Sequence, residues 1–331
     1  MRTCYPLMAT ILLAGLGGCG SDGNDAEQTG RLNFGVSDAP VQEASEVVLV
    51  FNHVVLIPES GGDPIVIDFA AENGAPERVD LLKNPGTTVH PLVTDLELPV
   101  GDYRMCLYAL DGEVGNADLS YVTTPDGTVP LQVNAKGSCF GTKPDTSAAG
   151  RLKLAEGDRL LTINTGINNF VAEFDLHKGL VDPVGQAGMF IKPNSVTLLN
   201  TAAAGSISGA LPEAQASACI NDLSATDPIV HAAYLYVGSL DRTGMGDVIG
   251  SASYPSGSPL VEPAAVATVG EDDQYQFGFV GEGSYSIGYS CLAGLDQPES
   301  HETDFAIYQH YVDVTVVAEQ ETVQDLLVIA P

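Results

Sequence analysis

The chain has 331 residues, of which 43 are acidic and only 13 are lysine or arginine, so its formal net charge is −30. This charge repels nucleic acid and anionic lipid headgroups, which excludes nucleic-acid partners. A hydrophobic content of 44% is enough to bury a core and excludes a disordered chain, and the length favours two domains.

A short apolar run begins at Leu7 and ends at Leu16. It is about half as long as the ~20 residues that cross a bilayer, and its length is typical of the core of a secretion signal. Leu16-Gly17-Gly18-Cys19 follows directly and resembles a bacterial lipobox. The resemblance implies that residues 1–18 are a lipoprotein signal peptide and that Cys19 becomes the lipidated first residue.

Residues 19–30 are rich in glycine and acidic side chains, which predicts a flexible tether. Eleven such residues span about 20 Å as a random coil. Two or more acyl chains anchor a protein stably, so the predicted partner of this segment is a membrane. Position 20 is glycine rather than the aspartate that retains many Gram-negative lipoproteins at the inner membrane. By this resemblance we expect an outer-membrane lipoprotein that faces the periplasm or the cell surface.

Strand patterns dominate the rest of the chain, whereas glycine and proline interrupt almost every window that is long enough for a helix. Apolar residues alternate with polar ones, or β-branched residues cluster, in several short runs bounded by turn residues. This pattern predicts an all-β fold of two antiparallel β-sandwiches, immunoglobulin-like or transthyretin-like. The clearest runs are residues 46–58, 275–280, 285–291 and 311–317.

The run at 311–317 also predicts which side chains are buried. Val312, Val314 and Val316 alternate with Asp313 and Thr315, so a period of two places the three valines on one buried face.

A run of small residues at 200–211 separates the two expected domains. We place the boundary near Ala204, with one sandwich at residues 31–203 and a second at 204–331. Few contacts are expected to cross this boundary, so each sandwich should fold when expressed alone.

Several phrases of the first domain resemble a known family, the bacterial domain of unknown function 4382, which is common in lipoproteins. The resemblance implies no established activity. The phrases occur in order at residues 31–56, 78–82, 98–103, 173–180 and 189–199.

The second domain opens with "GSISGAL" and later contains "GEGSYSIGYSC". These phrases resemble the carboxypeptidase regulatory-like, or transthyretin-like, sandwich. That resemblance implies a fold and no chemistry.

Six cysteines occur, and the position of each predicts its state. Cys4 leaves with the signal peptide, Cys19 carries lipid, and the remaining four allow three pairings. One bridge per domain requires Cys106–Cys139 and Cys219–Cys291, and the oxidising envelope favours these bonds. We expect the second bridge to be buried, and the first to be more exposed because Arg104 lies on its face.

No cofactor is expected, because the histidines and cysteines have no metal-ligand spacing. Calcium is the one metal that stays a candidate, because oxygen ligands often bind it in the loops of β-sandwiches. Its candidate ligands are Asp38, Glu173 and Asp175, which lie in the phrases that resemble the family. The alternative for Asp38 is a turn, in which the side chain bonds its own backbone.

A remote alternative is a hydrolase, because the Gly-Ser-Ile-Ser-Gly segment at 205–209 resembles the nucleophile elbow. The elbow requires a strand before it and a helix after it, and here Pro212 argues against a helix.

The sequence therefore favours a non-catalytic, lipid-anchored envelope protein with a structural, adhesive or partner-presenting role. The alternative is a module that binds a glycan or another small ligand. Four tyrosines are candidates for stacking on a sugar, although the chain has no tryptophan: Tyr121, Tyr234, Tyr236 and Tyr308.

Overall fold

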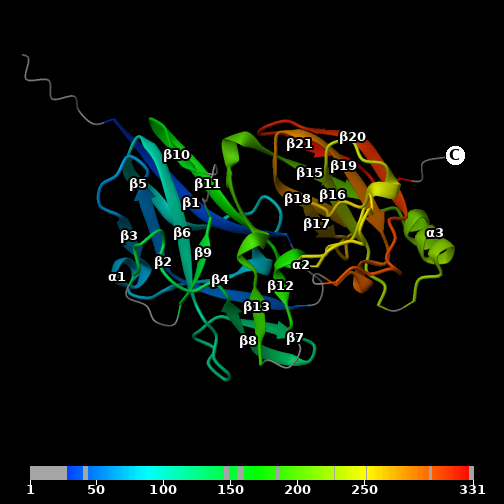
Figure 1. The fold of residues 1–331 in the computed structure, drawn as a ribbon, viewed down its shortest axis with the longest axis horizontal. Helices are drawn as coiled ribbons and strands as arrows, with labels where there is room; N and C mark the ends of the chain where they lie inside the picture. Colours follow the sequence, from blue (N-terminus) through cyan, green and yellow to red (C-terminus); the bar gives the residue numbers. More distant parts are fainter. Residues whose placement is uncertain are drawn as a thin grey trace, which may run out of the picture.

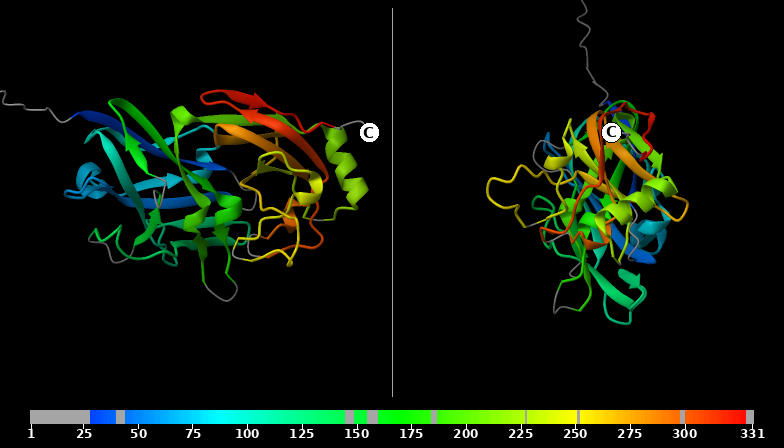
Figure 2. Two further views of the ribbon diagram at one scale, coloured as in Figure 1. Left: turned by 45° about the horizontal axis from the view of Figure 1, so that its top comes forward. Right: turned by 90° about the vertical axis from the view of Figure 1, so that its right-hand side faces the viewer.

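The structure is a computed structural model that describes residues 28–39, 44–144, 149–154, 160–183, 187–226, 228–250, 252–297 and 300–327. The first half (residues 29–200) and the second half (residues 204–327) lie side by side along the long axis of the molecule (Figures 1 and 2).

The first half consists mainly of strands. Their bounds are β1 Thr29–Ala39, β2 Glu46–Pro58, β3 Ile65–Asp68, β4 Glu77–Asp80, β5 His90–Pro99, β6 Gly101–Leu110, β7 Tyr121–Thr124, β8 Gly127–Val133, β9 Ala149–Lys153, β10 Leu161–Ile163, β11 Gly166–Asp175, β12 Leu180–Val181, β13 Met189–Ile191 and β14 Val196–Asn200. Its two short α-helices are α1 Phe69–Asn73 and α2 Leu176–Gly179, and 3-10 turns occupy Leu81–Lys83, Pro193–Ser195 and Thr201–Ala203.

These strands form two sheets that enclose one apolar core. The smaller sheet has the order β14-β11-β1-β5, and the larger has the order β10-β6-β2-β7-β8-β13-β12 with β3, β4 and β9 at its sides. The rings of Phe51 and Phe174 pack 6.2 Å apart between the sheets. The opposite face of β2 is also buried, because Val55 packs with Cys106 and Cys139 in a second apolar cluster.

The second half also has two sheets. Its strands are β15 Ala204–Ala210, β16 Ala232–Val237, β17 Ala265–Thr268, β18 Gln274–Gly281, β19 Gly283–Ser290, β20 Gln309–Val316 and β21 Glu321–Val323. One sheet has the order β18-β15-β21 and the other β17-β16-β19-β20. Alternate residues of β18 and β19 face the core between them, including Phe277, Ile287 and Tyr289.

The all-β fold predicted from the sequence is confirmed, but not all of the strand pairs are antiparallel. β1 pairs with β11, β8 with β13, and β15 with β21 in parallel. A parallel pair needs a long crossover between its strands, and residues 40–165 separate β1 from β11. The described residues also contain no helix that is long and apolar enough to cross a membrane.

One helix contradicts the expectation that Pro212 prevents helix formation. Helix α3 spans Glu213–Leu223, and Pro212 is its N-cap residue. Proline is tolerated here because the first backbone N–H groups of a helix have no partner within it. At its other end, Ser224 adopts the left-handed conformation that ends many helices.

The predicted alternation in β20 is wrong at its first residue. Val314 and Val316 are buried, but Val312 is 42% exposed and Tyr311 is buried in its place. The cause is a β-bulge: between the pairs Tyr285–Val314 and Ile287–Tyr311, β20 contains one more residue than β19. Asp313 has a φ of 60° at this point. An extra residue reverses the alternation of faces, which the sequence period alone cannot show.

Both predicted disulfides are present, Cys106–Cys139 in the first half and Cys219–Cys291 in the second. All four cysteines are fully buried. The expectation that the first bridge would be exposed is therefore wrong. Tyr108 and Ala149 pack over it, and the cationic groups of Arg104 and Lys153 lie over the ring of the neighbouring Phe140.

Candidate functional site

The last residues of β11 place two carboxylates against the second half of the chain. Phe174 is fully buried in the core of the first half. Successive residues of a strand point to opposite faces, so Glu173 and Asp175 lie together on the other face. Glu173 and Asp175 line a cavity whose remaining walls come from β14 and from several segments of the second half.

The three calcium candidates do not form one site. Asp38 of β1 pairs in register with Phe174, whereas Ser37 pairs with Glu173. Residues paired across neighbouring strands share a face, so Asp38 lies on the face opposite to the two other carboxylates. The described part of the chain contains no group of three His, Cys, Asp or Glu side chains that could hold a metal ion.

Two polar contacts of helix α2 join the halves. The α2 helix follows Asp175 directly, and the Asp175 side chain caps it by accepting the backbone N–H of Lys178 at 3.0 Å. His177 Nε2 lies 3.4 Å from Asp296 Oδ2, and Lys178 Nζ lies 3.6 Å from Glu262 Oε1. We call the region where the halves meet around α2, β11 and β18 the junction.

Asp296 belongs to a buried polar network in the second half. Its Oδ1 accepts the backbone N–H of Val248 at 3.0 Å, and the fully buried Tyr234 ring packs against His177. Asp247 is likewise buried and is 2.9 Å from His301 Nδ1. Sequence reasoning missed these residues, because Asp247 is 54 positions from His301 and the group has no recognisable spacing.

The junction cavity has a volume of about 190 Å³ and is mostly apolar. Its walls come from β11 and β14 of the first half and from β16, β18 and β19 of the second. Wall residues include Leu199, Leu235, Val237, Phe277, Phe279 and Tyr285. Val237 is 74% exposed, so one side of the cavity reaches solvent.

Burial in this apolar setting changes the protonation of both carboxyl groups. Desolvation raises the pKa of Glu173 to about 8, the negative charge of Asp175 adds to the rise, and the backbone amide of Phe279 opposes it. Desolvation also raises the pKa of Asp175, and His177 and the backbone amides of Lys178 and Val266 oppose that rise. At neutral pH the Glu173 carboxyl is therefore mostly protonated.

Two glycines let the backbones of the halves touch at the junction. Gly278 lies on β18, and a Cβ atom there would overlap the backbone of Gly86 in the first half. Only glycine permits such an approach. A side chain at position 278 must push the halves apart, because the obstacle is backbone rather than a flexible side chain.

We expect Gly278→Ala to destabilise the junction, because overpacking typically costs about 1–3 kcal/mol. Gly281→Ala on the same strand is the matched control, since its Cβ would meet only the Tyr285 hydroxyl at 3.8 Å. Calorimetric melting of the two variants measures the effect. Equal melting temperatures for both would show that the close contact at Gly86 contributes nothing.

The four tyrosines proposed to stack on sugars are not arranged as a binding surface. Tyr234 and Tyr236 are completely buried. Tyr121 lies under the guanidinium of Arg78 in the first half, and Tyr308 donates a hydrogen bond to Asp222 in the second. No two of these rings are both exposed and coplanar, so the glycan alternative gains no support from them.

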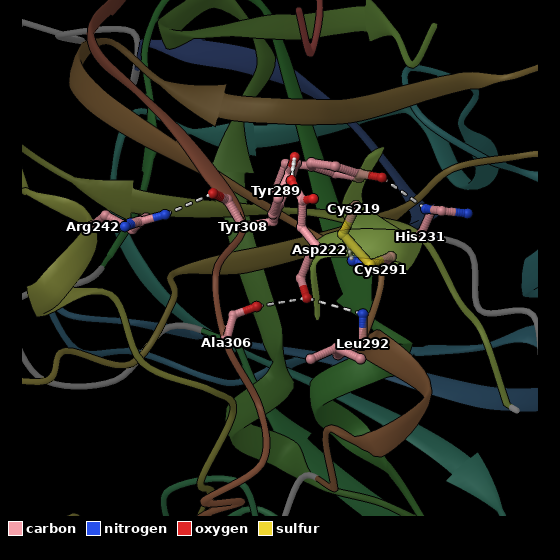
Figure 3. The surroundings of a disulfide bond; sticks show 10 residues. Cys219, Asp222, His231, Arg242, Tyr289, Cys291, Leu292, Ala306 and Tyr308 are labelled. Carbon is pink, nitrogen blue, oxygen red and sulfur yellow. Dashed lines mark hydrogen bonds between the residues drawn. A yellow bond between two sulfur atoms is a disulfide. The ribbon is translucent and has the colours of Figure 1, made fainter. Parts of the chain in front are cut away.

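Figure 3 shows the surroundings of the Cys219–Cys291 bridge, which joins α3 to the end of β19. The Tyr289 hydroxyl and His231 Nδ1 form a hydrogen bond at 2.8 Å, and the rings of the two residues stack 6.0 Å apart. Tyr308 packs edge-on against Tyr289. Tyr289 and the partly buried Tyr308 pack in the same core cluster as the two cysteines.

The segment at 205–209, on which the hydrolase alternative rests, does not have the residues or the structure of a nucleophile elbow. Ile207 occupies the centre of the 205–209 segment, where a nucleophile elbow has its serine. The whole segment lies inside strand β15 rather than at a turn. Cys19 and the predicted signal peptide lie outside the described residues, so lipidation stays a prediction.

Comparison with known proteins identifies part of the first half. Residues 29–193 match the family model described as "Domain of unknown function (DUF4382)". The resemblance seen in the sequence is confirmed for this segment, whereas the transthyretin-like resemblance of the second half stays a prediction. A search of the curated proteins finds no match.

Solved structures show only remote similarity. The Bacillus anthracis TIE protein is 7% identical with a TM-score of 0.18; the match covers 90% of this chain and 34% of that one, so this chain spans about a third of its length. Shaft pilin SpaA from Lactobacillus rhamnosus GG is 8% identical, with coverages of 92% and 99% and a TM-score of 0.18. A protein of Parabacteroides distasonis ATCC 8503 with a proposed role in cell adhesion is 11% identical, with coverages of 92% and 92% and a TM-score of 0.18. Similarities at this level carry no inference about function.

Proposed function

For a chain that carries a DUF4382 domain at residues 29–193, we propose a lipid-anchored, non-catalytic role in the cell envelope. In this role the first half is the membrane-proximal part, and it presents the second half to a partner. The predicted anchor is Cys19 at the outer membrane. The predicted tether, expected from the sequence at residues 19–30, is shorter than expected because β1 already begins at Thr29. The protein then acts as a structural or adhesive spacer.

The observation that carries the proposal is the placement of the two ends. β1 begins at one end of the long axis, and α3 lies at the other end (Figure 1). A lipid attached ahead of β1 therefore holds α3 and the second half on the side away from the membrane. The junction contacts at His177 and Lys178 favour a fixed spacing of the two halves over a freely jointed chain.

A small-ligand module is the second candidate, and the junction cavity rather than the tyrosines favours it. The two candidates are compatible, because the cavity lies between the halves and leaves the distal end of the molecule free. Surface or periplasmic exposure can be distinguished by protease treatment of intact cells, which degrades only a surface-exposed protein.

We expect Cys19→Ala to abolish lipidation and to release the protein from the membrane fraction, because only the thiol can form the thioether with diacylglycerol. Cells labelled with a fatty-acid analogue measure the effect. Cys4→Ala, within the predicted signal peptide, is the matched control and should be labelled like the wild type. An unlabelled wild-type protein would contradict the anchoring role and indicate a plain secreted protein.

A further inference from the structure

We propose that the junction cavity binds a small primary alkylammonium ion, with its charge on Glu173 and Asp175 and its carbon chain among the apolar side chains. The inference does not depend on the envelope role proposed above. It follows from the charge, the polarity and the size of the cavity.

The carboxyl groups of Glu173 and Asp175 favour a positively charged ligand in the cavity. Asp175 is 9% exposed, and its Oδ1 accepts the Lys178 N–H. Its Oδ2 is buried and makes no hydrogen bond of normal geometry with any described residue. The Val266 backbone amide also favours the charged form of Asp175. A buried carboxylate oxygen without a full partner is costly, and an ammonium group that donates to it removes this cost.

The nearby cations of the protein already have other partners. His177 pairs with Asp296, and Lys178 pairs with Glu262. Tyr285 is the remaining titratable side chain of the cavity wall, and it donates its hydroxyl to the Gly281 carbonyl at 2.8 Å. The other wall side chains do not titrate, so no cationic side chain lines the cavity itself.

The apolar walls and the volume select the rest of the ligand. An apolar protein cavity of about 150 Å³ holds one benzene molecule, and this cavity measures about 190 Å³. It therefore accommodates a chain of about six carbons behind the ammonium group. A hydrated metal ion would leave the Leu235 and Phe277 side of the cavity unfilled. The exposed Val237 marks the entrance.

The test is calorimetric titration of the purified full chain with n-hexylamine, with 1-hexanol as the uncharged probe of the same shape. We expect hexylamine to bind at least tenfold more tightly than hexanol. The double variant Glu173→Gln/Asp175→Asn should bind hexylamine at least tenfold more weakly. Glu113→Gln, an exposed carboxylate of the first half, is the control and should bind like the wild type.

Binding should also strengthen as the pH rises. With a pKa of about 8, about 1% of Glu173 is ionised at pH 6 and about 90% at pH 9, so the apparent affinity rises by up to ~90-fold. The amine stays protonated across this range, since its pKa is close to the ~10.4 of lysine. The double variant should lose most of this pH dependence.

Val237→Arg keeps the test valid if the double variant does not fold. It places a guanidinium at the exposed entrance, within reach of the carboxylates, and should weaken hexylamine binding without changing the core. The proposal is overturned if hexanol binds as tightly as hexylamine, if affinity is constant or falls between pH 6 and pH 9, or if hexylamine does not bind the folded wild-type chain.

Discussion

Replacing both Cys219 and Cys291 by alanine should lower the free energy of unfolding of the second half by about 4 kcal/mol. The bridge joins residues that are 72 positions apart. In the chain-entropy model, releasing a loop of this length stabilises the unfolded chain by about that amount. Urea unfolding, followed by circular dichroism, measures the change.

Helix α3 should lose much of its order in the same variant. Gln215 and Cys219 are its only fully buried residues, so the bridge provides one of the helix's two deep contacts. A helix of 11 residues is marginal in water without tertiary packing. A reduced helical signal before global unfolding is therefore expected.

The double variant Cys106→Ala/Cys139→Ala is the matched comparison, because its bridge spans 33 positions and is equally buried. It should destabilise the first half by a similar amount and leave the helical signal of α3 unchanged. A change below about 1 kcal/mol on removal of Cys219–Cys291 would show that strain or residual unfolded structure cancels the entropic gain.

Glu173→Gln should stabilise the protein at pH 9 and have little effect at pH 5. The folded pKa of about 8 lies above the ordinary value of 4.5. At a pH between 4.5 and 8, Glu173 has lost its proton in the unfolded chain but keeps it in the folded chain. Stability contributed by this side chain is therefore complete below pH 4.5 and is lost as the pH rises through 8. Glutamine has no proton to lose.

This shift in the Glu173 pKa corresponds to a change of at most about 4–5 kcal/mol in the free energy of unfolding. We expect about 2 kcal/mol, because the Glu173 side chain is only partly buried and opening of the junction can hydrate its charge. Thermal melting of both proteins at pH 5 and pH 9 gives the difference. The exposed Glu113→Gln variant should match the wild type at both values, and an equal effect of Glu173→Gln at pH 5 and pH 9 would contradict the assignment.

Local patterns in the sequence were sufficient for the strand content and for the disulfides. Strand β2 ends at Pro58, where its β-branched run stops. The two bridges followed from counting cysteines and placing one bridge in each half, and both pairs are present. The predicted strand run at 275–280 lies within β18, and its Tyr275 and Phe277 are buried.

Backbone geometry beyond the local pattern could not be predicted. The bulge between Tyr311 and Val314 leaves Val312 exposed, because one extra residue there breaks the alternation of faces. Pro212 was interpreted as a helix breaker, although it occupies the one end of a helix that tolerates proline. In both places the same residues fit two local structures, and packing against neighbouring strands decides between them.

The sequence by itself determined that this protein is an all-β chain with a bridge in each half, because period-two alternation and cysteine count are properties of short segments. Only the tertiary structure decided the junction. Strand β11 pairs with β1 in parallel. The face of β11 that carries Glu173 and Asp175 lines the same cavity as residues of β18. The ion pairs beside them, His177–Asp296 and Lys178–Glu262, join residues about a hundred positions apart. Contacts of this kind depend on how sheets pack, and no spacing in the sequence encodes them.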